Sequence, residues 1–325
     1  MVQRSTLGVI LSAGKSSRLY PATLATTKQL LPVYDKPLIY YPLTTLMLAG
    51  VQDVLVITSR DEQTIFQRLL GTGSELGMHF DYIIQDKPEG IAQSLTLAND
   101  YLAAFADAGP LGDGFDNSKY NSVFLILGDN LFYGSGLSGT FGSAVSNCVN
   151  HQRAQTFFQK VKDPSRFGVG EFGPAGDLIG IEEKPQHPKS EFACVGAYLY
   201  PMNTPNDGLT YAGKLNPSAR GELEITDLNQ VYIKEGKMNG YILPRGTSWF
   251  DCGTYDSLLE AAQYVKAVQE HQGYLVGSPH EIAFNRGWID VDGVRAFMDK
   301  TGGRTKNAYN EYLYNMVTSG RSPTQ

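Results

Sequence analysis

The chain has 325 residues, with 27 lysines and arginines against 33 aspartates and glutamates, and a formal net charge of −6 at pH 7. This acidic balance argues against a nucleic-acid partner, because nucleic-acid binding needs a basic face. A hydrophobic content of 42% with 18% charged residues excludes a disordered chain, and the length predicts two domains at most, or one large α/β domain with an appendage.

The cysteines and the apolar stretches predict where the protein resides. Cys148, Cys194 and Cys252 lie far apart and form no C-x-x-C pair, which favours a reducing compartment over a disulfide framework or a structural zinc site. The N-terminus lacks the pattern of a signal peptide. The longest mostly apolar stretch, residues 38–51, is too short to span a bilayer. We therefore expect a soluble cytoplasmic protein without a membrane partner.

The first half of the chain alternates short apolar runs with amphipathic segments. Strands are predicted over residues 8–11, 53–58 and 121–127, and helices over residues 42–49, 62–70 and 91–106. This alternation indicates βαβ units, a mainly parallel sheet and helices on both of its faces. Ligands of such sheets bind beyond the carboxyl ends of the strands, so the loops after Leu11 and Leu127 are the first candidates for a site.

The second half of the chain has a different character. Residues 107–122 are rich in Gly, Asp and Asn and predict an exposed loop. Further short strands are predicted over residues 157–161, 169–172, 179–183 and 193–199. Because turns separate them closely, we expect an added small mixed sheet.

A long helix and a helical subdomain are predicted at the C-terminal end. Residues 254–271 predict a helix with Thr254 as N-cap. Its buried face is expected to carry Leu258, Leu259, Ala262 and Val265. Beyond it, Phe284, Trp288, Phe297, Tyr309, Tyr312 and Leu313 predict a small helical subdomain, and residues 319–325 are expected to be frayed.

The loop after the first strand is built of small residues, which allow backbone N–H groups to approach a phosphate. Gly14-Lys15-Ser16 matches the end of a P-loop, but that pattern requires glycine at position 9, where Val9 stands. The G-x-G-x-x-G motif of dinucleotide folds is absent. Two interpretations stay open from this loop alone: a nucleoside-triphosphate loop that uses Arg18 and Lys28 as cations, or an ordinary turn.

Several motifs follow this loop in a fixed order. They begin with Thr27-Lys-Gln-Leu-Leu-Pro-Val33, Asp35-Lys-Pro37 and Tyr40-Tyr-Pro-Leu43, and continue at residues 85–93, 127–134, 163–169, 182–185, 219–227 and 249–253. Together they resemble the sugar-1-phosphate nucleotidylyltransferases, and within that family the members that use dTTP and glucose 1-phosphate. The resemblance extends to about Phe284. It implies a Rossmann-like, mainly parallel mixed sheet flanked by helices, with the added sheet serving the sugar.

The resemblance implies transfer of a deoxythymidylyl group from dTTP to α-D-glucose 1-phosphate, giving dTDP-glucose and pyrophosphate. The attacking phosphate oxygen is already an anion, so no general base is needed and catalysis consists of positioning and charge neutralisation. The catalytic groups that it implies are Arg18, Lys184 and Asp129. Asp129 and Asp251 are the implied ligands of a Mg²⁺ cofactor, which usually takes one or two carboxylates together with substrate phosphates.

The same resemblance implies two sets of binding residues. Those for the nucleotide are Gly14, Arg18, Lys28, Gln29, Gln85 and Gly90. Those for the sugar phosphate are Asn130, Gly168, Glu183, Lys184, Cys194 and Glu222. The two glutamines are implied as base readers, since an amide both donates and accepts hydrogen bonds. A structural ion pair between Arg220 and Glu222 is an alternative role for that glutamate.

The predicted organisation is a nucleotidyltransferase domain over residues 1–265 and a C-terminal helical subdomain over residues 266–325. Within the first, residues 1–135 bind the nucleotide and mainly residues 136–253 bind the sugar. Similar enzymes are homotetramers with a second nucleotide-sugar site for feedback inhibition. The resemblance implies either that Arg245 belongs to such a site or that it has only a structural packing role.

Two departures from the family pattern leave functional alternatives open. Ser16 replaces a family glycine, and a positive φ there would cost about 1 kcal/mol. Cys194-Val195-Gly196 replaces a V-T-G segment at the sugar pocket. The alternatives are an enzyme for UTP or another sugar 1-phosphate, a non-catalytic nucleotide-sugar sensor and, most remotely, a P-loop kinase.

Overall fold

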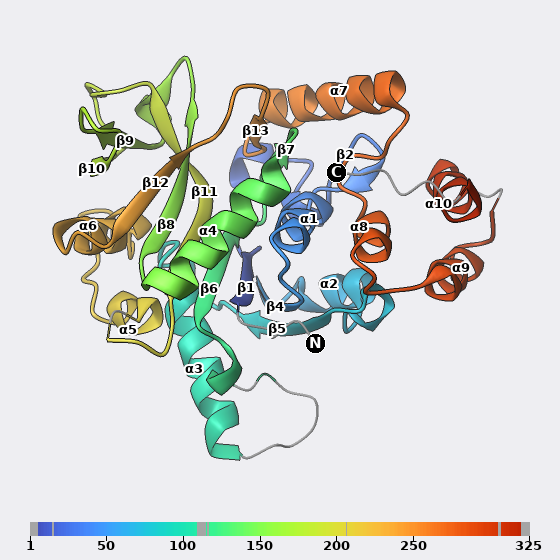
Figure 1. Ribbon diagram of the computed structural model, residues 1–325, viewed down its shortest axis with the longest axis horizontal. Coiled ribbons are helices and arrows are strands. Elements are labelled where there is room, and N and C mark those ends of the chain that lie inside the picture. The colour runs from blue at the N-terminus through green and yellow to red at the C-terminus, as the bar shows by residue number, and fades with distance from the viewer. Residues whose placement is uncertain are drawn as a thin grey trace.

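The computed structural model describes residues 6–14, 16–108, 115, 117–205, 207–304 and 307–319. Within these residues, a nine-stranded mixed sheet is flanked by helices on both faces (Figure 1). Its parallel half consists of β6 (Ser122–Leu127), β1 (Thr6–Leu11), β4 (Asp53–Thr58) and β5 (His79–Ile84), in that order. The three predicted strands of the first half are therefore confirmed, and β5 joins them.

The strands of the second half extend the same sheet. They are β8 (Ala154–Lys160), β9 (Gly168–Phe172), β10 (Leu178–Glu183), β11 (Phe192–Pro201) and β12 (Met238–Ile242). β11 runs antiparallel to β6 on one side and to β8 and β9 on the other. The predicted added sheet is thus hydrogen-bonded to the parallel half through β11, which ties the two halves of the chain together.

Helices cover the two faces of the sheet in two sets. One face carries α3 (Gln93–Ala108), α5 (Gly208–Ala212) and α6 (Ile225–Lys234), which pack over residues such as Leu7 and Val9. The other carries α1 (Tyr40–Leu48), α2 (Gln63–Leu70) and α4 (Leu137–His151), which pack over Ile10 and its neighbours. The alternation along β1 follows from the two-residue period of a strand.

Glycine at position 8 sets how closely α1 approaches the sheet. A Cβ there would lie 2.9 Å from Leu46 Cδ1 of α1 and 3.0 Å from side-chain atoms of Val51 and Val54. A larger residue at position 8 would require these three side chains to move.

The predicted exposed loop over residues 107–122 is wrong in part. Ser122 begins β6, residues Asn117–Lys119 form a short 3₁₀ helix, and Phe115 and Tyr120 are buried, with 3% and 1% exposure. Phe115 stacks on His79, and the Tyr120 hydroxyl donates to Asp53 Oδ2 at 3.0 Å. The polar composition of the segment led to the prediction of an exposed loop, although these two aromatic side chains are buried. Residues 109–114 and 116 of the predicted loop lie outside the described residues.

The long helix α7 (Tyr255–Gln272) begins as predicted. Thr254 and Ser257 form a reciprocal capping box at its N-terminus. One part of the expected buried face is wrong, because Leu259 is 58% exposed. Ala261 and Val265 are fully buried instead, with Leu258, Ala262 and Val268 packed beside them. At 100° per residue, Leu259 lies off this stripe.

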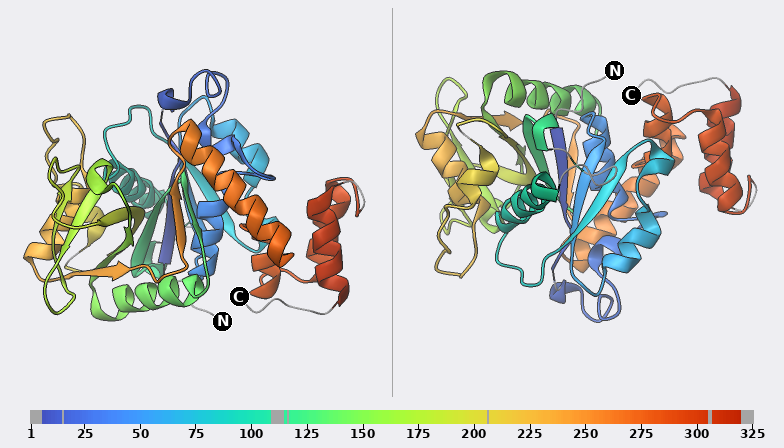
Figure 2. Two further views of the ribbon diagram at one scale, coloured as in Figure 1. Left: turned by 90° about the horizontal axis from the view of Figure 1, so that it is seen from above. Right: turned by 90° about the horizontal axis from the view of Figure 1, so that it is seen from below.

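The C-terminal helices α8 (Pro279–Asn285), α9 (Val291–Lys300) and α10 (Ala308–Ser319) form the predicted helical unit. Both views of Figure 2 place α9 and α10 at the opposite end of the molecule from α5 and α6. Their small core contains Leu313, Phe297, Tyr309 and Tyr312 as expected, whereas Trp288 packs against the core of the main sheet. The predicted boundary at residue 265 falls inside α7, and the division into domains stays a prediction.

Buried polar contacts attach α9 and α10 to α8. His280 stacks on Phe297 at 3.6 Å between ring centroids, and its Nδ1 lies 3.0 Å from the Tyr309 hydroxyl. Next to it, the fully buried Glu281 accepts a hydrogen bond from Tyr312 at 2.9 Å, while its other oxygen has no partner among the described residues. Burial raises the pKa of Glu281 to about 7, against the lowering effects of Tyr312 and Lys36. Glu281 therefore changes its protonation state close to neutral pH.

Four smaller strands complete the structure. β2 (Pro32–Val33) pairs with β3 (Lys36–Pro37), and β7 (Asn130–Tyr133) pairs with β13 (Ser248–Asp251).

None of the helices among the described residues has the length and apolar character that crossing a bilayer requires.

Glu281 makes stability depend on pH in a defined direction. Folding raises the pKa of this carboxyl from 4.5 to about 7, so the folded chain keeps a proton that the unfolded chain has lost. The contribution of this carboxyl to the free energy of unfolding is present in full below its unfolded pKa of 4.5. It is lost as the pH rises through its folded pKa of about 7. Relative to the natural chain, Glu281→Gln should gain on the order of 3 kcal/mol of unfolding free energy between about pH 5 and about pH 8.

Urea unfolding at several pH values measures this difference. Glu270→Gln on exposed α7 is the matched control and should show no such trend. A stability difference between Glu281→Gln and the natural chain that is the same at every pH would contradict the assignment.

Candidate active site

The parallel pairing of β1 with β6 brings two loops together at the carboxyl edge of the sheet. Leu11 and Leu127 are register partners at the ends of these strands, and Gly128 N–H donates to the Leu11 carbonyl at 2.9 Å. A Cβ at position 128 would lie 2.5 Å from Ser12 Oγ, so only glycine allows this approach. The segment after β1 therefore lies beside Asp129, as the sequence predicted.

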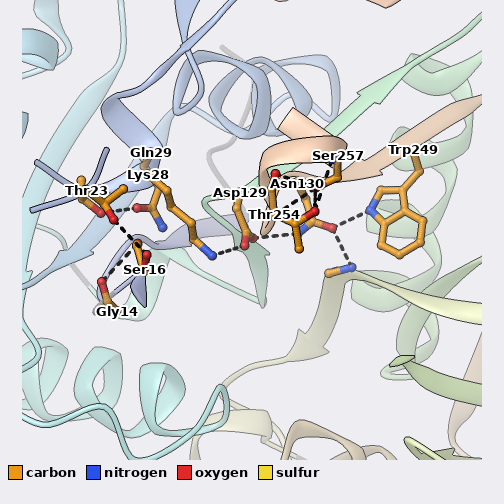
Figure 3. A network of polar contacts seen from close by, with 12 residues as sticks. Gly14, Ser16, Thr23, Lys28, Gln29, Asp129, Asn130, Trp249, Thr254 and Ser257 are labelled. Carbon is orange, nitrogen blue, oxygen red and sulfur yellow. Dashed lines mark hydrogen bonds and ion pairs between the residues drawn. The ribbon is translucent and has the colours of Figure 1, made fainter. Parts of the chain in front are cut away.

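A partly buried ion pair occupies the centre of this edge. Lys28 Nζ contacts Asp129 Oδ2, and Asn130 Nδ2 donates to the other oxygen of Asp129 at 2.9 Å (Figure 3). Burial acts against both charges, but the pair overcomes it. The Lys28 charge and the hydrogen bonds from Lys28 and Asn130 lower the pKa of Asp129, and Asp129 raises the pKa of Lys28. Both groups are held in their charged forms.

Asp251 places a second carboxylate next to this pair. It is the register partner of Asn130 in the β7–β13 ribbon, and the next residue, Cys252, donates its N–H to the Asp129 carbonyl at 3.0 Å. Burial and then the charge of Asp129 raise the pKa of Asp251 to about 6. Within the described residues, the Asp251 carboxylate has no hydrogen-bond or ion-pair partner.

These two carboxylates fit the donor set that Mg²⁺ uses. No cluster of three or more metal-ligating side chains occurs in the part of the chain that the structure describes. Mg²⁺ does not need such a cluster, since one or two carboxylates suffice when substrate phosphates supply the other oxygens. A buried carboxylate without a partner, as at Asp251, is the negative charge that a cation would offset.

The loop after β1 contains strained backbone. Gly14 has φ +154°, and Ser16 adopts the left-handed conformation with φ 45° and ψ 31°. Thr23 Oγ1 donates to the Ser16 carbonyl at 2.9 Å and holds this shape (Figure 3). A 3₁₀ turn, Ser17–Leu19, follows in place of the α-helix that a P-loop requires, which argues against the kinase interpretation. Lys15 lies outside the described residues.

Arg18 lies on this turn and is exposed. Its guanidinium approaches the tip of the β13 segment, because a Cβ on Gly253 would be 3.1 Å from Arg18 Nη2 and 3.2 Å from Asp251 Oδ1. The cation is therefore placed beside the second carboxylate and open to solvent.

The predicted base readers are buried and held by neighbours. Gln29 is 2% exposed and accepts a hydrogen bond from Thr27 Oγ1 at 2.5 Å, while Gln85 is 4% exposed and donates to Gln93 Oε1 at 2.5 Å. Gly90 has φ +108°, and a Cβ there would lie 2.6 Å from the backbone nitrogen of Leu223. Close packing on Leu223 thus requires glycine at position 90 independently of any ligand.

The predicted sugar-phosphate residues meet at the edge of the added strands. Gly168 pairs with Glu183 across β9 and β10, and a Cβ on Gly168 would lie 3.4 Å from Glu183 Oε2 and 3.5 Å from Cys194 Cβ. Lys184 follows with φ 45°, and its Nζ lies 3.3 Å from Glu183 Oε1. Thr226 Oγ1 donates to Glu183 Oε2 at 2.7 Å. Thr226 was not predicted as a site residue, although it lies inside the motif at residues 219–227.

Burial keeps the Cys194 side chain neutral. It raises the pKa of this thiol to about 12, and the sulfur lies 3.2 Å from Thr156 Oγ1. Cys194 therefore contributes an uncharged side chain next to Gly168.

Glu222 stands at the rim of this region. Arg220 Nη2 lies 3.7 Å from Glu222 Oε2, 3.5 Å from Glu183 Oε1 and 2.8 Å from Glu224 Oε2. The ion pair considered as an alternative is present, but Glu224 is the closer partner of Arg220.

Trp249 is a further residue that the sequence did not single out. Its Nε1 donates to Asn130 Oδ1 at 2.5 Å, and Gly196 N–H donates to the same oxygen at 3.2 Å (Figure 3). These two donors turn the amide nitrogen of Asn130 toward Asp129. The geometry thus links the sugar-side strand β11 to the ion pair through one buried amide.

A family model described as a nucleotidyl transferase matches residues 7–268 of the chain. The chain belongs to the nucleotidyl transferase family. This assignment confirms the resemblance inferred from the ordered motifs and covers every residue of the candidate site.

Two named relatives are similar in sequence to this nucleotidyl transferase over nearly its whole length. A Neisseria gonorrhoeae protein named glucose-1-phosphate thymidylyltransferase is 43% identical over 313 residues, covering 95% of this chain and 99% of the relative. A protein of the same name from Mycobacterium tuberculosis (strain CDC 1551 / Oshkosh) is 42% identical over 310 residues, covering 95% and 98%.

Solved structures share the fold. One of a Bacillus anthracis protein assigned as a glucose-1-phosphate thymidylyltransferase matches with a TM-score of 0.67 and 37% identity, covering 80% of this chain and 95% of that one. A UDP-glucose pyrophosphorylase in complex with UDP-glucose matches with a TM-score of 0.64, covering 81% and 99%. At 20% identity, the second match supports the fold alone.

Ser16 gives a stability prediction for this loop. Ser16→Gly should raise the free energy of unfolding by up to about 1 kcal/mol, because glycine adopts the left-handed conformation without a Cβ clash. Ser16→Ala keeps the Cβ and loses only a weak 3.4 Å hydrogen bond to the Gly14 carbonyl, so it should bring no gain. Urea unfolding of both variants measures this, and equal stabilisation by alanine would rule out backbone strain as the cause.

Proposed function

We propose that this nucleotidyl transferase transfers a deoxythymidylyl group from dTTP to α-D-glucose 1-phosphate, giving dTDP-glucose and pyrophosphate. The observation that carries the proposal is the partly buried Lys28–Asp129 pair with Asp251 beside it, at the carboxyl edge of the sheet. The predicted base readers Gln29 and Gln85 lie in segments that follow β1 and β5. Among the predicted sugar residues, Gly168, Glu183 and Cys194 belong to β9, β10 and β11, and Asn130 belongs to β7 next to Asp129. Relatives more than 40% identical carry the corresponding name.

The chemistry requires no general base from the protein. A phosphate oxygen of the sugar 1-phosphate attacks the α-phosphorus of dTTP in line, and pyrophosphate leaves on the opposite side. Arg18, exposed beside Asp251, neutralises charge on the departing pyrophosphate, and Lys184 neutralises charge on the incoming sugar phosphate. When bound, Mg²⁺ supplies further charge neutralisation at the phosphates, and Asp129 and Asp251 would hold it.

The remaining side chains orient the two substrates. Gln29 and Gln85 pair with the edge of the base, Gly14 and Gly90 allow close backbone approach, and Lys28 contacts the nucleotide phosphates. Glu183 and Glu222 accept hydrogen bonds from sugar hydroxyls. Asn130, Gly168 and the Cys194 backbone lie against the sugar phosphate beside them.

The three cysteines are free and buried, which fits a reducing, cytoplasmic compartment. The homotetramer is the assembly that the family resemblance implies. A cavity of about 1510 Å³ lies between the β7–α4 turn, the end of α7 and α10, and Gly246 lines it next to Arg245 in the chain. The described residues that line this cavity include none of those assigned to catalysis. It is the proposed location of the nucleotide-sugar feedback site.

Pyrophosphate release tests the reaction directly. Release with Mg²⁺ is measured for dTTP and UTP, each combined with the 1-phosphates of glucose, N-acetylglucosamine and galactose. The highest kcat/KM is expected for dTTP with glucose 1-phosphate. A higher kcat/KM with UTP or another sugar would support the corresponding alternative enzyme. No release from any pair, with dTTP binding still detected by calorimetry, would support the sensor.

Asp129→Asn tests the role of the carboxylate. We expect a loss of Mg²⁺-dependent turnover of about 100-fold or more, because the variant lacks the negative charge that would hold the cation. Asp292→Asn on the exposed face of α9 is the matched control and should leave turnover unchanged. Retention of most activity by Asp129→Asn would refute the proposed centre, provided that thermal unfolding shows both variants to be folded.

A further inference from the structure

Gln93 is the last residue of the motif at residues 85–93 and has no role in the proposed reaction. It begins α3, directly after the loop that contains Gly90. Its side-chain amide contacts three groups: the backbone N–H of Glu89, the carboxylate of Glu89 and the side chain of Gln85. This amide therefore connects a fixed stretch of backbone to a predicted base reader.

The chemistry of Glu89 fixes which way the Gln93 amide faces. A backbone N–H can only donate, and the Gln93 atom 2.9 Å from it is Oε1. An ionised carboxylate can only accept, and the Gln93 atom 2.9 Å from Glu89 Oε2 is Nε2. Turning this amide over would set oxygen against carboxylate and nitrogen against the N–H. One orientation is therefore strongly favoured.

The orientation of Gln93 in turn fixes that of Gln85. Since Gln93 Oε1 can only accept, the Gln85 atom 2.5 Å from it must be the donor Nε2. Gln85 is 4% exposed, and its backbone N–H is tied to the Thr58 carbonyl at 2.8 Å. Among the described residues, nothing donates to Gln85 Oε1. Gln85 thus offers a ligand one fixed order of acceptor and donor.

Pyrimidine bases differ in the order that they require. Thymine and uracil carry a donor at ring position 3 and an acceptor at position 4, whereas cytosine carries an acceptor and then a donor. An amide that can turn over satisfies both orders, and an amide held in one orientation satisfies only one of them when the base sits in one place.

We propose that Gln93 is a specificity-determining positioning residue, which holds the Gln85 amide in the orientation that accepts thymine or uracil and rejects cytosine. This inference rests on the proposed function, in which Gln85 reads the base of the nucleoside triphosphate. Gln93 would act without touching the base, and its effect would explain how the enzyme discriminates between pyrimidines.

The loop has a separate support, which makes the residue testable. Leu223 N–H donates to the Glu89 carbonyl at 2.6 Å, and Ala92 N–H donates to the Leu223 carbonyl at 3.1 Å. These backbone bonds hold residues 89–92 whether or not Gln93 is present. Removing the Gln93 amide therefore frees the Gln85 side chain without releasing the loop.

Gln93→Leu is the test variant, and kcat/KM is measured with dTTP, dUTP and dCTP at saturating glucose 1-phosphate. The dCTP-to-dTTP ratio should rise about tenfold, the effect of losing one hydrogen bond that biases the amide. The dUTP-to-dTTP ratio should change less than about twofold, because both bases present the same edge. Asn99→Leu, an amide-to-leucine change at an exposed position of α3, should move neither ratio.

The double variant Glu89→Gln/Gln93→Glu exchanges the two functional groups. Position 93 then still accepts from Gln85 and from the backbone N–H, and position 89 donates to it. The natural dCTP-to-dTTP ratio should therefore return. An unchanged ratio in Gln93→Leu, an equal shift with dUTP, or failure of the double variant to restore the ratio would overturn the inference.

Calorimetric titration of the same variants with dTTP and dCTP measures discrimination without turnover. If the natural chain turns over no dTTP, the proposed function fails, and the binding ratio still decides the role of Gln93. A binding ratio that Gln93→Leu leaves unchanged would overturn that role.

Discussion

The parallel pairing of β1 with β6 is the constraint on which the site depends. Both strands are buried on both faces, and a one-residue slip would turn every core side chain toward the wrong set of helices. The register therefore fixes Leu11 opposite Leu127. That single pairing brings the loop with Gly14 and Ser16 beside Asp129, although more than 100 residues of chain separate them.

Electrostatics then divides the work among the cations. The chain is acidic, yet its proposed substrates are anions. Lys28 is partly buried, and its charge compensates Asp129. Arg18 and Lys184 remain solvent-accessible, at the rims of the two substrate sides. Asp251 keeps a carboxylate next to the pair without a partner of its own, at a cost in desolvation that raises its pKa. A cation bound there would relieve that cost.

The two halves of the site are joined by backbone as well as by side chains. The loop at residues 89–92 pairs with Leu223, which lies two residues before α6. On the other side of the centre, Asn130 accepts from Gly196 of β11 and from Trp249 of β13. The segments assigned to nucleotide and sugar are thus hydrogen-bonded to each other at two places.

The sequence by itself determined the elements and the family. Residues 53–58 form a strand with the predicted bounds because every position is apolar or buried in a parallel sheet, and Thr254 caps α7 because its hydroxyl satisfies an N–H at the helix start. The order of the motifs was enough to name the family, which a match over residues 7–268 confirmed. Local pattern carried these conclusions because helix periodicity, capping and motif order are properties of neighbouring residues.

Only the tertiary structure decided the contacts between distant segments. The sequence places Phe115 and Tyr120 in a polar loop, but in the folded chain Phe115 stacks on His79 and the Tyr120 hydroxyl donates to Asp53. Leu259 was expected on the core face of α7, but the cluster that α7 covers contacts Ala261 and Val265, and Leu259 lies off their stripe. Three hydrogen-bonded pairs could not be predicted from spacing along the chain: Trp249 with Asn130, Thr226 with Glu183, and Gln93 with Gln85. Hydrogen bonds to a buried amide or carboxylate depend on where strands end in space, which only the folded sheet determines.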